Sequence, residues 1–297
     1  MAVNGWIILD KPVGLGSTQA VAAVKRNMRE AGHGKVKVGH GGTLDPLAQG
    51  VLPIALGEAT KLCGRMLDAT KAYEFTLRFG EQTDTLDLEG AVIATSEVRP
   101  GPEQVLAVLP QFTGPIEQVP PIYSALKVEG RRAYDLARAG EDVELATRAV
   151  TVFDLSICSH DEALGEVTLR AIVSKGTYIR SLARDIALSL GSCGHVTLLR
   201  RIKAGPFSLE QAISLDKLNE IGKGAPLEDV ILPLEAGLDD IPALDLAPEA
   251  VVAVRQGRVL SGMPQGDGLY WAKAGDTPVA LVELEAGTAK VVRGFNL

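Results

Sequence analysis

Asp45 has the sequence surroundings of a reactive carboxylate. It stands at the exit of a glycine-rich turn, with Pro46 directly behind it and an apolar stretch beyond. Glycine allows backbone to approach a ligand closely, and proline fixes the chain behind the acid. A carboxylate held in this way could act as a nucleophile or stabilise a cationic sugar. Aspartate is also an ordinary turn residue, and the segment has neither phosphate-loop nor dinucleotide-binding spacing.

Three other side chains have ordinary structural interpretations, and for one of them the spacing adds a weak signal for an acidic or phosphate partner. Arg180 lies four residues before Arg184 in a helical pattern. This like-charge pair costs a helix a few tenths of a kcal/mol, which a nearby acid or phosphate would offset. Tyr73 alternates with apolar residues and could be a core tyrosine. His40 could be a solvated loop histidine.

The cysteines and histidines show no metal-ligand spacing. Cys63, Cys158 and Cys193 form no CxxC pair, so we expect reduced thiols in a cytoplasmic protein and neither a zinc site nor a disulfide. No apolar run approaches the length of a bilayer span, and the N-terminus lacks the features of a secretory signal. These patterns predict no zinc framework and no membrane attachment.

Local patterns predict the elements that position these side chains. Period-two alternation or short apolar runs predict strands at 6–9, 73–79, 150–157 and 166–173, with the last two paired as a hairpin. Helices are expected after Ser17, from Pro102 and from Thr177, with Gly191 ending the third. The glycine-rich residues 32–50 are expected to form a structured loop.

A domain boundary is expected near residues 232–245, where prolines and a glycine cluster with acidic residues. Residues 1–235 would form the catalytic domain and residues 240–297 a small second domain. The second domain is predicted to contain a helix begun by Pro248 and three strands at 269–273, 278–284 and 288–294. The apolar fraction of 46% is sufficient for a sizeable core.

The net charge of −7 permits nucleic-acid binding only if basic residues are concentrated locally. Residues 206–297 carry a net charge of −7, whereas residues 120–205 carry +2. Phosphate binding requires a basic surface and not a basic chain. The composition is therefore compatible with RNA binding without indicating it.

Six sequence blocks, taken in order, resemble one known family. Residues 39–52 are similar to the GHxGxLDPxAxGxL motif of the TruB family of tRNA pseudouridine synthases, although Gly41-Gly42 stands where the family usually has Thr-Gly. Five further blocks resemble the family in order and spacing, and all six lie within residues 5–207: 5–12, 71–74 with 80–87, 118–127 with Gly130, Arg131 and Tyr134, 174–180, and 195–201. Six ordered blocks make a chance match implausible.

The resemblance implies a fold and a reaction. The fold is α+β, with a mixed, mostly antiparallel sheet and a small C-terminal β-rich domain related to the PUA fold. The reaction converts uridine-55 in the T loop of tRNA to pseudouridine, by base flipping and aspartate-dependent cleavage of the N-glycosidic bond. It involves no net redox change and no transferred group, so no cofactor or metal is implied.

The resemblance also implies residue roles. Asp45 matches the nucleophilic aspartate, Arg180 the arginine that pairs with it, and Tyr73 the tyrosine that stacks on the target base. His40 matches the histidine that replaces the flipped base, and Tyr178 and Leu199 match residues around the uridine. Seven cations are expected to contact RNA phosphates: Lys127, Arg131, Arg132, Lys175, Arg200, Arg201 and Lys203.

Three functions stay open at this point. The chain could be a stand-alone enzyme for tRNA, a related synthase that needs a guide RNA and protein partners, or a non-enzymatic tRNA-folding factor. The bacterial-type blocks and the lack of long basic tails favour the first. We expect tRNA as the partner, no obligate protein partner, and a monomer.

Overall fold

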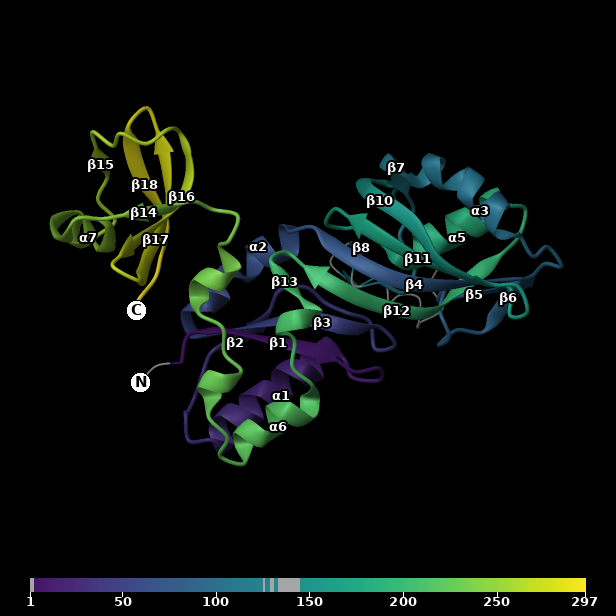
Figure 1. The fold of residues 1–297 in the computed structure, drawn as a ribbon, viewed down its shortest axis with the longest axis horizontal. Coiled ribbons are helices and arrows are strands. Elements are labelled where there is room, and N and C mark those ends of the chain that lie inside the picture. Colours follow the sequence, from purple (N-terminus) through teal and green to yellow (C-terminus); the bar gives the residue numbers. More distant parts are fainter. Residues whose placement is uncertain (1–2, 125, 129–130, 133–144) are drawn as a thin grey trace.

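A mixed β-sheet runs through the larger part of the molecule (Figure 1). The computed structural model describes residues 3–124, 126–128, 131–132 and 145–297. The sheet has nine strands, and its main order is β1 (Gly5–Lys11), β3 (Gln49–Leu56), β12 (Gly194–Ala204), β4 (Lys71–Phe79), β11 (Glu166–Val173), β10 (Arg148–Asp161) and β7 (Gly114–Gln118). Two short strands, β2 (Val38–His40) and β13 (Phe207–Ser208), pair with β3 and β12. These pairings confirm the predicted mixed, mostly antiparallel sheet.

The parallel contact between β3 and β12 joins the two halves of this sheet. Arg201 lies opposite Gly50, and Arg200 lies opposite Gln49. Gly50 has φ = +104°, and a Cβ at this position would collide with the carbonyl of Arg201. Only glycine therefore allows the two strands to meet here. Tyr73 and Leu199 pack against the apolar clusters on both sides of this junction.

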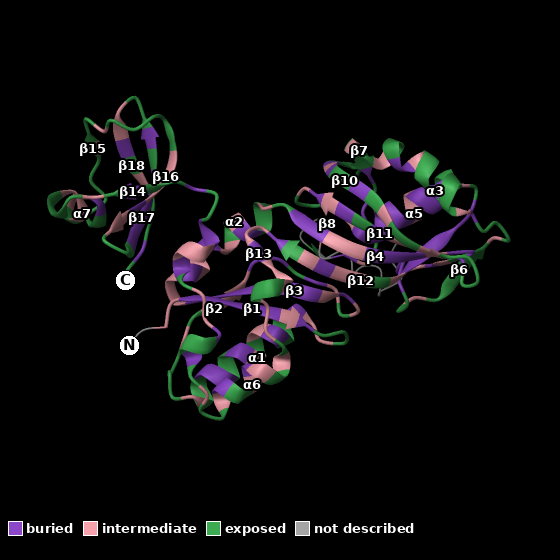
Figure 2. Cartoon of the chain, in the orientation of Figure 1, coloured by how far each residue is buried: buried purple, intermediate pink, exposed green. Residues whose placement is uncertain are grey.

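Each half of the sheet is covered by its own helices. Helices α1 (Ser17–Glu30) and α6 (Leu215–Gly222) lie beside the β1–β3 half, and α3 (Pro102–Val108) and α5 (Ile179–Ser189) beside the β11–β10 half (Figure 1). Apolar side chains at helical spacing are buried on α5, as the sequence predicts. Figure 2 shows buried residues concentrated on the strands and on the inner faces of the helices.

Short elements complete the larger part of the chain. They are η1 (Gly57–Leu62), α2 (Cys63–Asp68), β5 (Glu81–Thr83), β6 (Val92–Thr95), η2 (Leu109–Phe112), β8 (Lys127–Val128), β9 (Arg131–Arg132), η3 (Leu209–Gln211), η4 (Leu227–Asp229) and η5 (Leu234–Gly237). Strands β5 and β6 pair as a hairpin beside the end of β4. The turns around this hairpin contribute to the site described below.

The C-terminal residues form a separate five-stranded sheet, at the upper left of Figure 1. Its strands are β14 (Ala243–Asp245), β15 (Leu260–Ser261), β16 (Gly268–Ala274), β17 (Thr277–Glu285) and β18 (Thr288–Gly294), with α7 (Pro248–Arg255) beside them. Phe295 and Leu281 join the apolar cluster that contains Trp6. The amide of Asn296 donates a hydrogen bond of 2.7 Å to Glu58, which further ties this sheet to η1.

Most predicted elements are present, and several differ in extent. The hairpin of β10 and β11, the helices at Ser17 and Pro102, and the three C-terminal strands are confirmed. The prediction of a loop throughout 32–50 was wrong, because β2 forms at Val38–His40 and β3 begins at Gln49. Strands β3 and β12 and helix α6 were not predicted. In the described part of the chain, no helix is long and apolar enough to cross a membrane.

Candidate active site

Asp45 lies in the loop between β2 and β3, and buried groups hold this loop from several sides. Ser17, the first residue of α1, accepts a hydrogen bond of 2.8 Å from the amide of Leu44 and donates one of 3.0 Å to its carbonyl. Lys11 is buried, and its ammonium donates to the carbonyls of Leu15 and Pro46 at 2.6 and 3.2 Å. The residues on either side of Asp45 are thus fixed independently of its side chain.

Arg201 is buried behind the same loop. Its guanidinium donates to the carbonyls of Val51 at 2.7 Å, Gly42 at 3.0 Å and Thr43 at 3.4 Å. Only 1% of the residue is exposed. This burial argues against the predicted phosphate contact of Arg201. The sequence predicted Arg201 to be a surface cation, whereas the structure places it in the interior.

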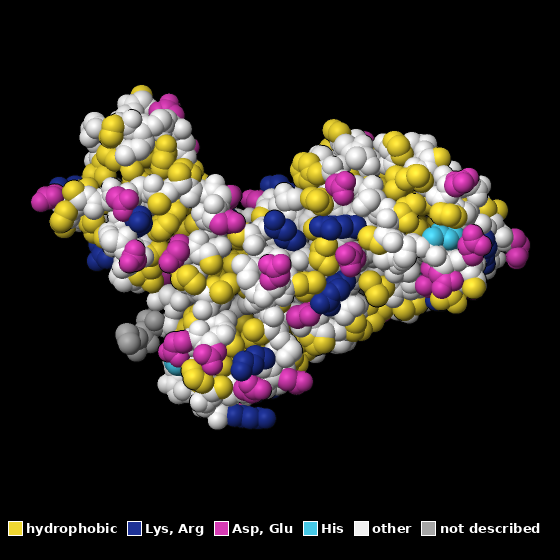
Figure 3. Space-filling view, viewed as in Figure 1, with side chains coloured by type: hydrophobic (Ala, Val, Ile, Leu, Met, Phe, Trp, Pro, Cys, Tyr) yellow, Lys and Arg dark blue, Asp and Glu magenta, His cyan; other side chains and the backbone are white. Residues whose placement is uncertain are grey.

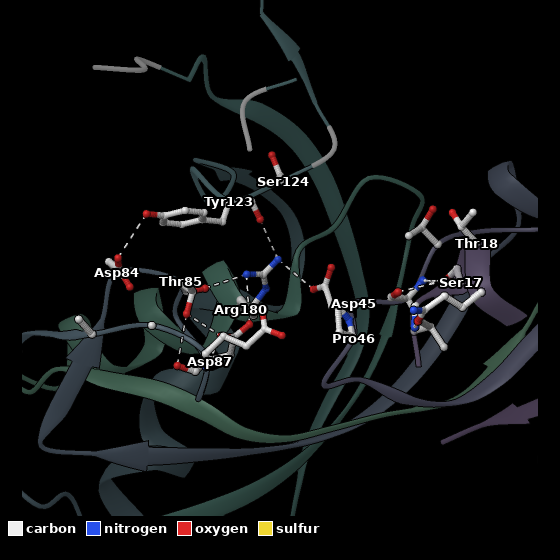
Figure 4. Close-up of a pocket in the computed structure, with 17 residues that line it drawn as sticks. Ser17, Thr18, Asp45, Pro46, Asp84, Thr85, Asp87, Tyr123, Ser124 and Arg180 are labelled. Atoms are coloured by element: carbon white, nitrogen blue, oxygen red, sulfur yellow. Dashed lines mark hydrogen bonds and ion pairs between the residues drawn. The ribbon is translucent and has the colours of Figure 1, made fainter. Parts of the chain in front are cut away.

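Arg180 brings two carboxylates together. It projects from the first turn of α5 and is buried, with Nη2 2.9 Å from Asp45 Oδ2 and Nη1 3.3 Å from Asp87 Oδ2. It also donates to the carbonyls of Thr85 at 2.8 Å and Tyr123 at 3.0 Å. Figure 4 shows its guanidinium between Asp45 on one side and Thr85 and Asp87 on the other. The like-charge pair of Arg180 and Arg184 suggested a nearby acid, and Asp45 and Asp87 are acids of that kind.

The turn that carries Asp87 is tightly constrained. Leu86 has φ = +64°, a conformation that costs a residue with a Cβ about 1–2 kcal/mol. Thr85 Oγ1 donates to Asp87 Oδ1 at 2.6 Å, and Thr83 Oγ1 donates to the Asp87 carbonyl at 2.6 Å. Asp87 was part of a matched block, but the sequence interpretation gave it no role. Its burial beside Arg180 identifies it as the second acid of the site.

The chain segment opposite this turn is attached to the start of α5. The Gln118 side chain accepts from the amide of Tyr178 at 2.7 Å and donates to its carbonyl at 3.1 Å. Ser181 donates to the carbonyl of Val119 at 2.8 Å. The Tyr123 hydroxyl then donates to Asp84 Oδ2 at 3.3 Å (Figure 4). Together with the hydrogen bond from Arg180 to its carbonyl, this contact places Tyr123 beside Arg180, on the side away from Asp45 (Figure 4).

Two cavities meet at Asp45 and Arg180. The larger has a volume of about 670 Å³ and is lined by the start of α1, the 84–91 turn, Tyr123 and Ser124. This volume lies in the range of small-molecule pockets. The smaller, of about 20 Å³, reaches Leu199 and has room for about one water. The Asp45 side chain is 42% exposed and lines both cavities, so a ligand can reach it.

The other predicted base-binding residues lie around this centre at different depths. Tyr178 precedes α5, and burial raises the pKa of its phenol despite a lowering contribution from the Ser124 hydroxyl. Tyr73 is half-buried at the junction of the two sheet halves and lines neither cavity. His40 is half-buried in β2, where Nδ1 accepts from the amide of Gly42 at 3.3 Å. Burial, with a smaller contribution from Arg201, lowers the pKa of His40, which favours the neutral imidazole.

The cations predicted to bind phosphate differ in whether they are exposed or already paired with an acid. Arg200 pairs with Asp10 at 2.8 Å, and Lys175 pairs with Asp68 at 2.9 Å. Lys203 and Arg131 are exposed. The side chains of Lys127 and Arg132 lie outside the described part of the structure.

The fold and this site together define a class of enzyme. A mixed sheet with an aspartate and arginine pair in a cleft between its halves is the architecture of a pseudouridine synthase, an isomerase. The model of the TruB family pseudouridylate synthase N-terminal domain matches residues 26–179, and that of the tRNA pseudouridylate synthase B C-terminal domain matches residues 180–239. The chain belongs to the TruB family, and it is a pseudouridine synthase, an isomerase.

Similar proteins cover nearly the whole chain. A protein of Novosphingobium aromaticivorans named tRNA pseudouridine synthase B is 70% identical over 99% of this chain and 98% of its own length. One of the same name from Zymomonas mobilis is 57% identical over 99% of this chain and 97% of its own. One from Caulobacter vibrioides is 48% identical over 100% and 97%.

Solved structures of larger assemblies contain a similar fold. A chain from an H/ACA RNP bound to a substrate RNA containing 2′-deoxyuridine has a TM-score of 0.74 and 26% identity, covering 99% of this chain and 85% of that chain. A chain from a Cbf5-Nop10-Gar1 complex has a TM-score of 0.73 and 28% identity, covering 99% and 84%. These likenesses support the α+β fold and its C-terminal β domain.

Proposed function

We propose that the enzyme converts uridine-55 in the T loop of tRNA to pseudouridine, with Asp45 as the reacting carboxylate. The observation that carries the proposal is the Asp45 and Arg180 ion pair at 2.9 Å, placed at the wall of a cavity large enough for a nucleotide. The relatives named tRNA pseudouridine synthase B support the choice of tRNA as the substrate.

The reaction is an isomerisation that needs no co-reactant. The bond between N1 and C1′ breaks, the base turns, and a bond between C5 and C1′ forms. A proton leaves C5 and N1 gains one, so atoms and electrons balance. The Asp45 carboxylate assists by attacking C1′ or C6, while Arg180 holds it in one orientation. Tyr73 is the candidate for the base that removes the proton.

The base must leave the stacked T loop before it can react. Extrusion costs a few kcal/mol, and stacking on an aromatic face such as that of Tyr73 contributes about 1–3 kcal/mol. His40, as a neutral imidazole, fills the vacated position in the RNA. Tyr178 and Leu199 flank the uridine. Because Tyr73 lines neither cavity and the cavity at Leu199 holds about one water, the uridine enters by widening this end of the site.

The RNA backbone binds to basic residues beside the cleft. Figure 3 shows Lys and Arg side chains gathered near α2 and the adjoining ends of β4 and β12, between the C-terminal sheet and the β7 and β10 region. Lys175, Arg200 and Lys203 belong to this proposed surface, together with Lys127, Arg131 and Arg132. Residues 1–235 form the catalytic domain in this proposal, and residues 240–297 a PUA-like domain that contacts the acceptor side of the tRNA.

The guide-dependent alternative has weaker support. Three relatives at 48–70% identity carry the name tRNA pseudouridine synthase B, whereas the chains from the H/ACA RNP and the Cbf5-Nop10-Gar1 complex are only 26–28% identical. We therefore propose that the enzyme works on tRNA without an obligate protein partner, as a monomer in the cytoplasm.

Tritium release tests the proposed reaction. A tRNA transcript labelled with tritium at uridine C5 loses one label for each pseudouridine formed. We expect wild type to release one label per tRNA from position 55, and Asp45→Asn to release none while still binding the transcript. A transcript with cytidine at position 55 provides the control. Release from that transcript at the wild-type level would contradict the assignment of uridine-55.

The folding-factor alternative gives a different result in the same experiment. A pure folding factor binds the transcript tightly and releases no tritium from any uridine. It also keeps its full effect on tRNA folding in Asp45→Asn. The combination of tight binding and absent release in wild type would therefore reject the enzymatic proposal.

A further inference from the structure

A cluster of cations covers the second half of α1 and the loop that follows it. Lys25, Arg26, Arg29, Lys35 and Lys37 are all exposed, and Glu30 is the only acidic residue between positions 25 and 37. We call these five residues the α1 basic surface. Its excess of positive charge contrasts with the net charge of −7 on the whole chain. None of the five was among the cations predicted to contact RNA.

Most of this charge is not neutralised within the protein. In the described parts of the structure, no residue forms an ion pair with Lys25, Arg29, Lys35 or Lys37, and Arg26 donates only to the neutral side chain of Asn219, at 3.0 Å. By contrast, Arg200 and Lys175 of the surface predicted from the sequence are each paired with an aspartate. The α1 basic surface therefore has more free positive charge to offer a phosphate.

The stability of α1 does not account for this arrangement. A cation in the last turn, such as Arg29, interacts favourably with the helix dipole. However, Lys25 and Arg29 are four residues apart, and this like-charge spacing destabilises a helix. Lys35 and Lys37 lie beyond the helix, where the dipole has little effect. A polyanion bound across the surface would offset the repulsion between these cations.

Helix α1 begins at the active site, and the α1 basic surface covers its far half and the loop that returns to β2. The N-terminal residues of α1 line the large cavity, and the helix has 14 residues, so its far end is about 21 Å away. The chain then returns through Lys35 and Lys37 into β2, which ends at His40. At about 3.3 Å per extended residue, Lys37 lies about 10 Å from His40.

We propose that the α1 basic surface binds the sugar-phosphate backbone of the substrate RNA, outside the nucleotides that enter the cavity. The inference rests on the proposed function for the identity of the RNA. Lysine and arginine that neutralise phosphates release bound counterions, which makes the affinity depend on salt. The distance from Asp45 separates this contact from the chemistry, so it affects binding and not the reacting groups.

The salt dependence of tRNA binding tests this surface. Two double variants remove its charge in separate parts, Lys25→Gln with Arg29→Gln and Lys35→Gln with Lys37→Gln. A matched control removes two exposed or half-exposed cations of the neighbouring α6 region, Lys217→Gln with Lys223→Gln. The slope of log Kobs against log salt changes by about 0.7–0.9 for each phosphate contact. We expect each test variant to lower the magnitude of the slope by about 1.4–1.8, and the control to leave it unchanged.

The outcomes separate this inference from the proposed function. We expect both test variants to release tritium at the wild-type rate when tRNA is saturating, because Asp45 and Arg180 are untouched. Slopes equal to that of the α6 control would overturn the inference while leaving the enzymatic proposal intact. If the two test variants have lower slopes but wild type releases no tritium, the α1 basic surface is upheld and the proposed reaction is rejected.

Discussion

The two buried arginines of the active site, Arg180 and Arg201, hold the same loop in different ways. Arg180 binds the carboxylate of Asp45 and reaches a second acid, Asp87. Arg201 forms no ion pair within the described residues and donates only to the carbonyls of Val51, Gly42 and Thr43. One arginine acts on the side chain that reacts, and the other on the backbone that carries it.

The two arginines therefore have different roles: Arg180 balances the charge of the acids, and Arg201 positions the backbone of the loop. An arginine beside carboxylates balances charge in the site, and its planar fork fixes their orientation. An arginine among carbonyls leaves its own charge uncompensated, which is costly in the interior. Its hydrogen bonds to three carbonyls offset part of this cost. The active site therefore needs both the charge of Arg180 and the geometry provided by Arg201.

Removing Arg180 should cause the largest losses of stability and of kcat. In Arg180→Met, the buried Asp87 loses its cationic partner, and Asp45 is free to rotate. Breaking a buried ion pair from one side costs about 3–5 kcal/mol of stability, and loss of a positioned charge lowers kcat by about 100-fold or more. Thermal unfolding and single-turnover tritium release measure the two effects.

A conservative variant and a double variant sharpen this prediction. Arg180→Lys keeps the charge but cannot contact both acids with a planar fork, so we expect kcat to stay well below wild type. Asp87→Asn introduced into Arg180→Met removes the unpaired buried acid and should recover part of the lost stability without recovering kcat. Recovery of kcat in the double variant would mean that Arg180 serves only to neutralise Asp87.

Arg201→Met should affect stability more than chemistry. The substitution leaves the carbonyls of Gly42, Thr43 and Val51 without their donor, and each unsatisfied buried group costs about 1–3 kcal/mol. Because the Asp45 and Arg180 pair remains, we expect a smaller loss of kcat than in Arg180→Met, of about tenfold. Denaturant unfolding and the same single-turnover assay provide the comparison. A loss of kcat equal to that of Arg180→Met, in folded protein, would show that the two arginines are not separable.

The same contrast explains what the sequence could predict. Strand β4 alternates Tyr73, Phe75, Leu77 and Phe79 with polar residues, and this period-two pattern reveals a half-buried strand. Strand β12 was missed because it interrupts its apolar residues with Arg200 and Arg201 and bulges twice against β4. A charged residue at an interior position breaks the pattern from which strands are inferred.

The site was predictable to the extent that its residues lie in recognisable blocks. Asp45, Arg180 and Leu199 were singled out, and the structure places Asp45 and Arg180 where the two cavities meet and Leu199 at the wall of the smaller one. Asp87 and Lys11 lay in matched blocks but received no role, because what distinguishes them is burial against partners remote in sequence. Leu86 was equally unremarked, since a positive φ in a leucine follows from the surrounding turn and not from the residue type.

We expect the smallest effect from Lys11, whose substitution should change how stability depends on pH and test how the Asp45 loop is held. Burial lowers its pKa to about 8, although the charge of Asp45 acts in the opposite direction. The unfolded chain binds the proton up to the ordinary pKa of lysine, near 10.5. Between these values the unfolded state carries more protons, so the contribution of Lys11 to stability rises with pH. Below pH 8 both states are protonated, and the contribution is constant.

The difference in unfolding free energy between wild type and Lys11→Met isolates this residue from other titrating groups. We expect the difference to be flat from pH 6 to about 7 and then to move in favour of wild type from about pH 8 to pH 10. Lys71 is also buried, with a pKa of about 8, but its ammonium donates to the carbonyls of Met66 and Leu67 at the end of α2 and not to a carbonyl next to Asp45. Lys71→Met should therefore reproduce the pH trend in stability while leaving kcat unchanged, whereas Lys11→Met should lower kcat as well. Equal kcat values for the two variants would show that the contact of Lys11 with the Pro46 carbonyl does not position Asp45.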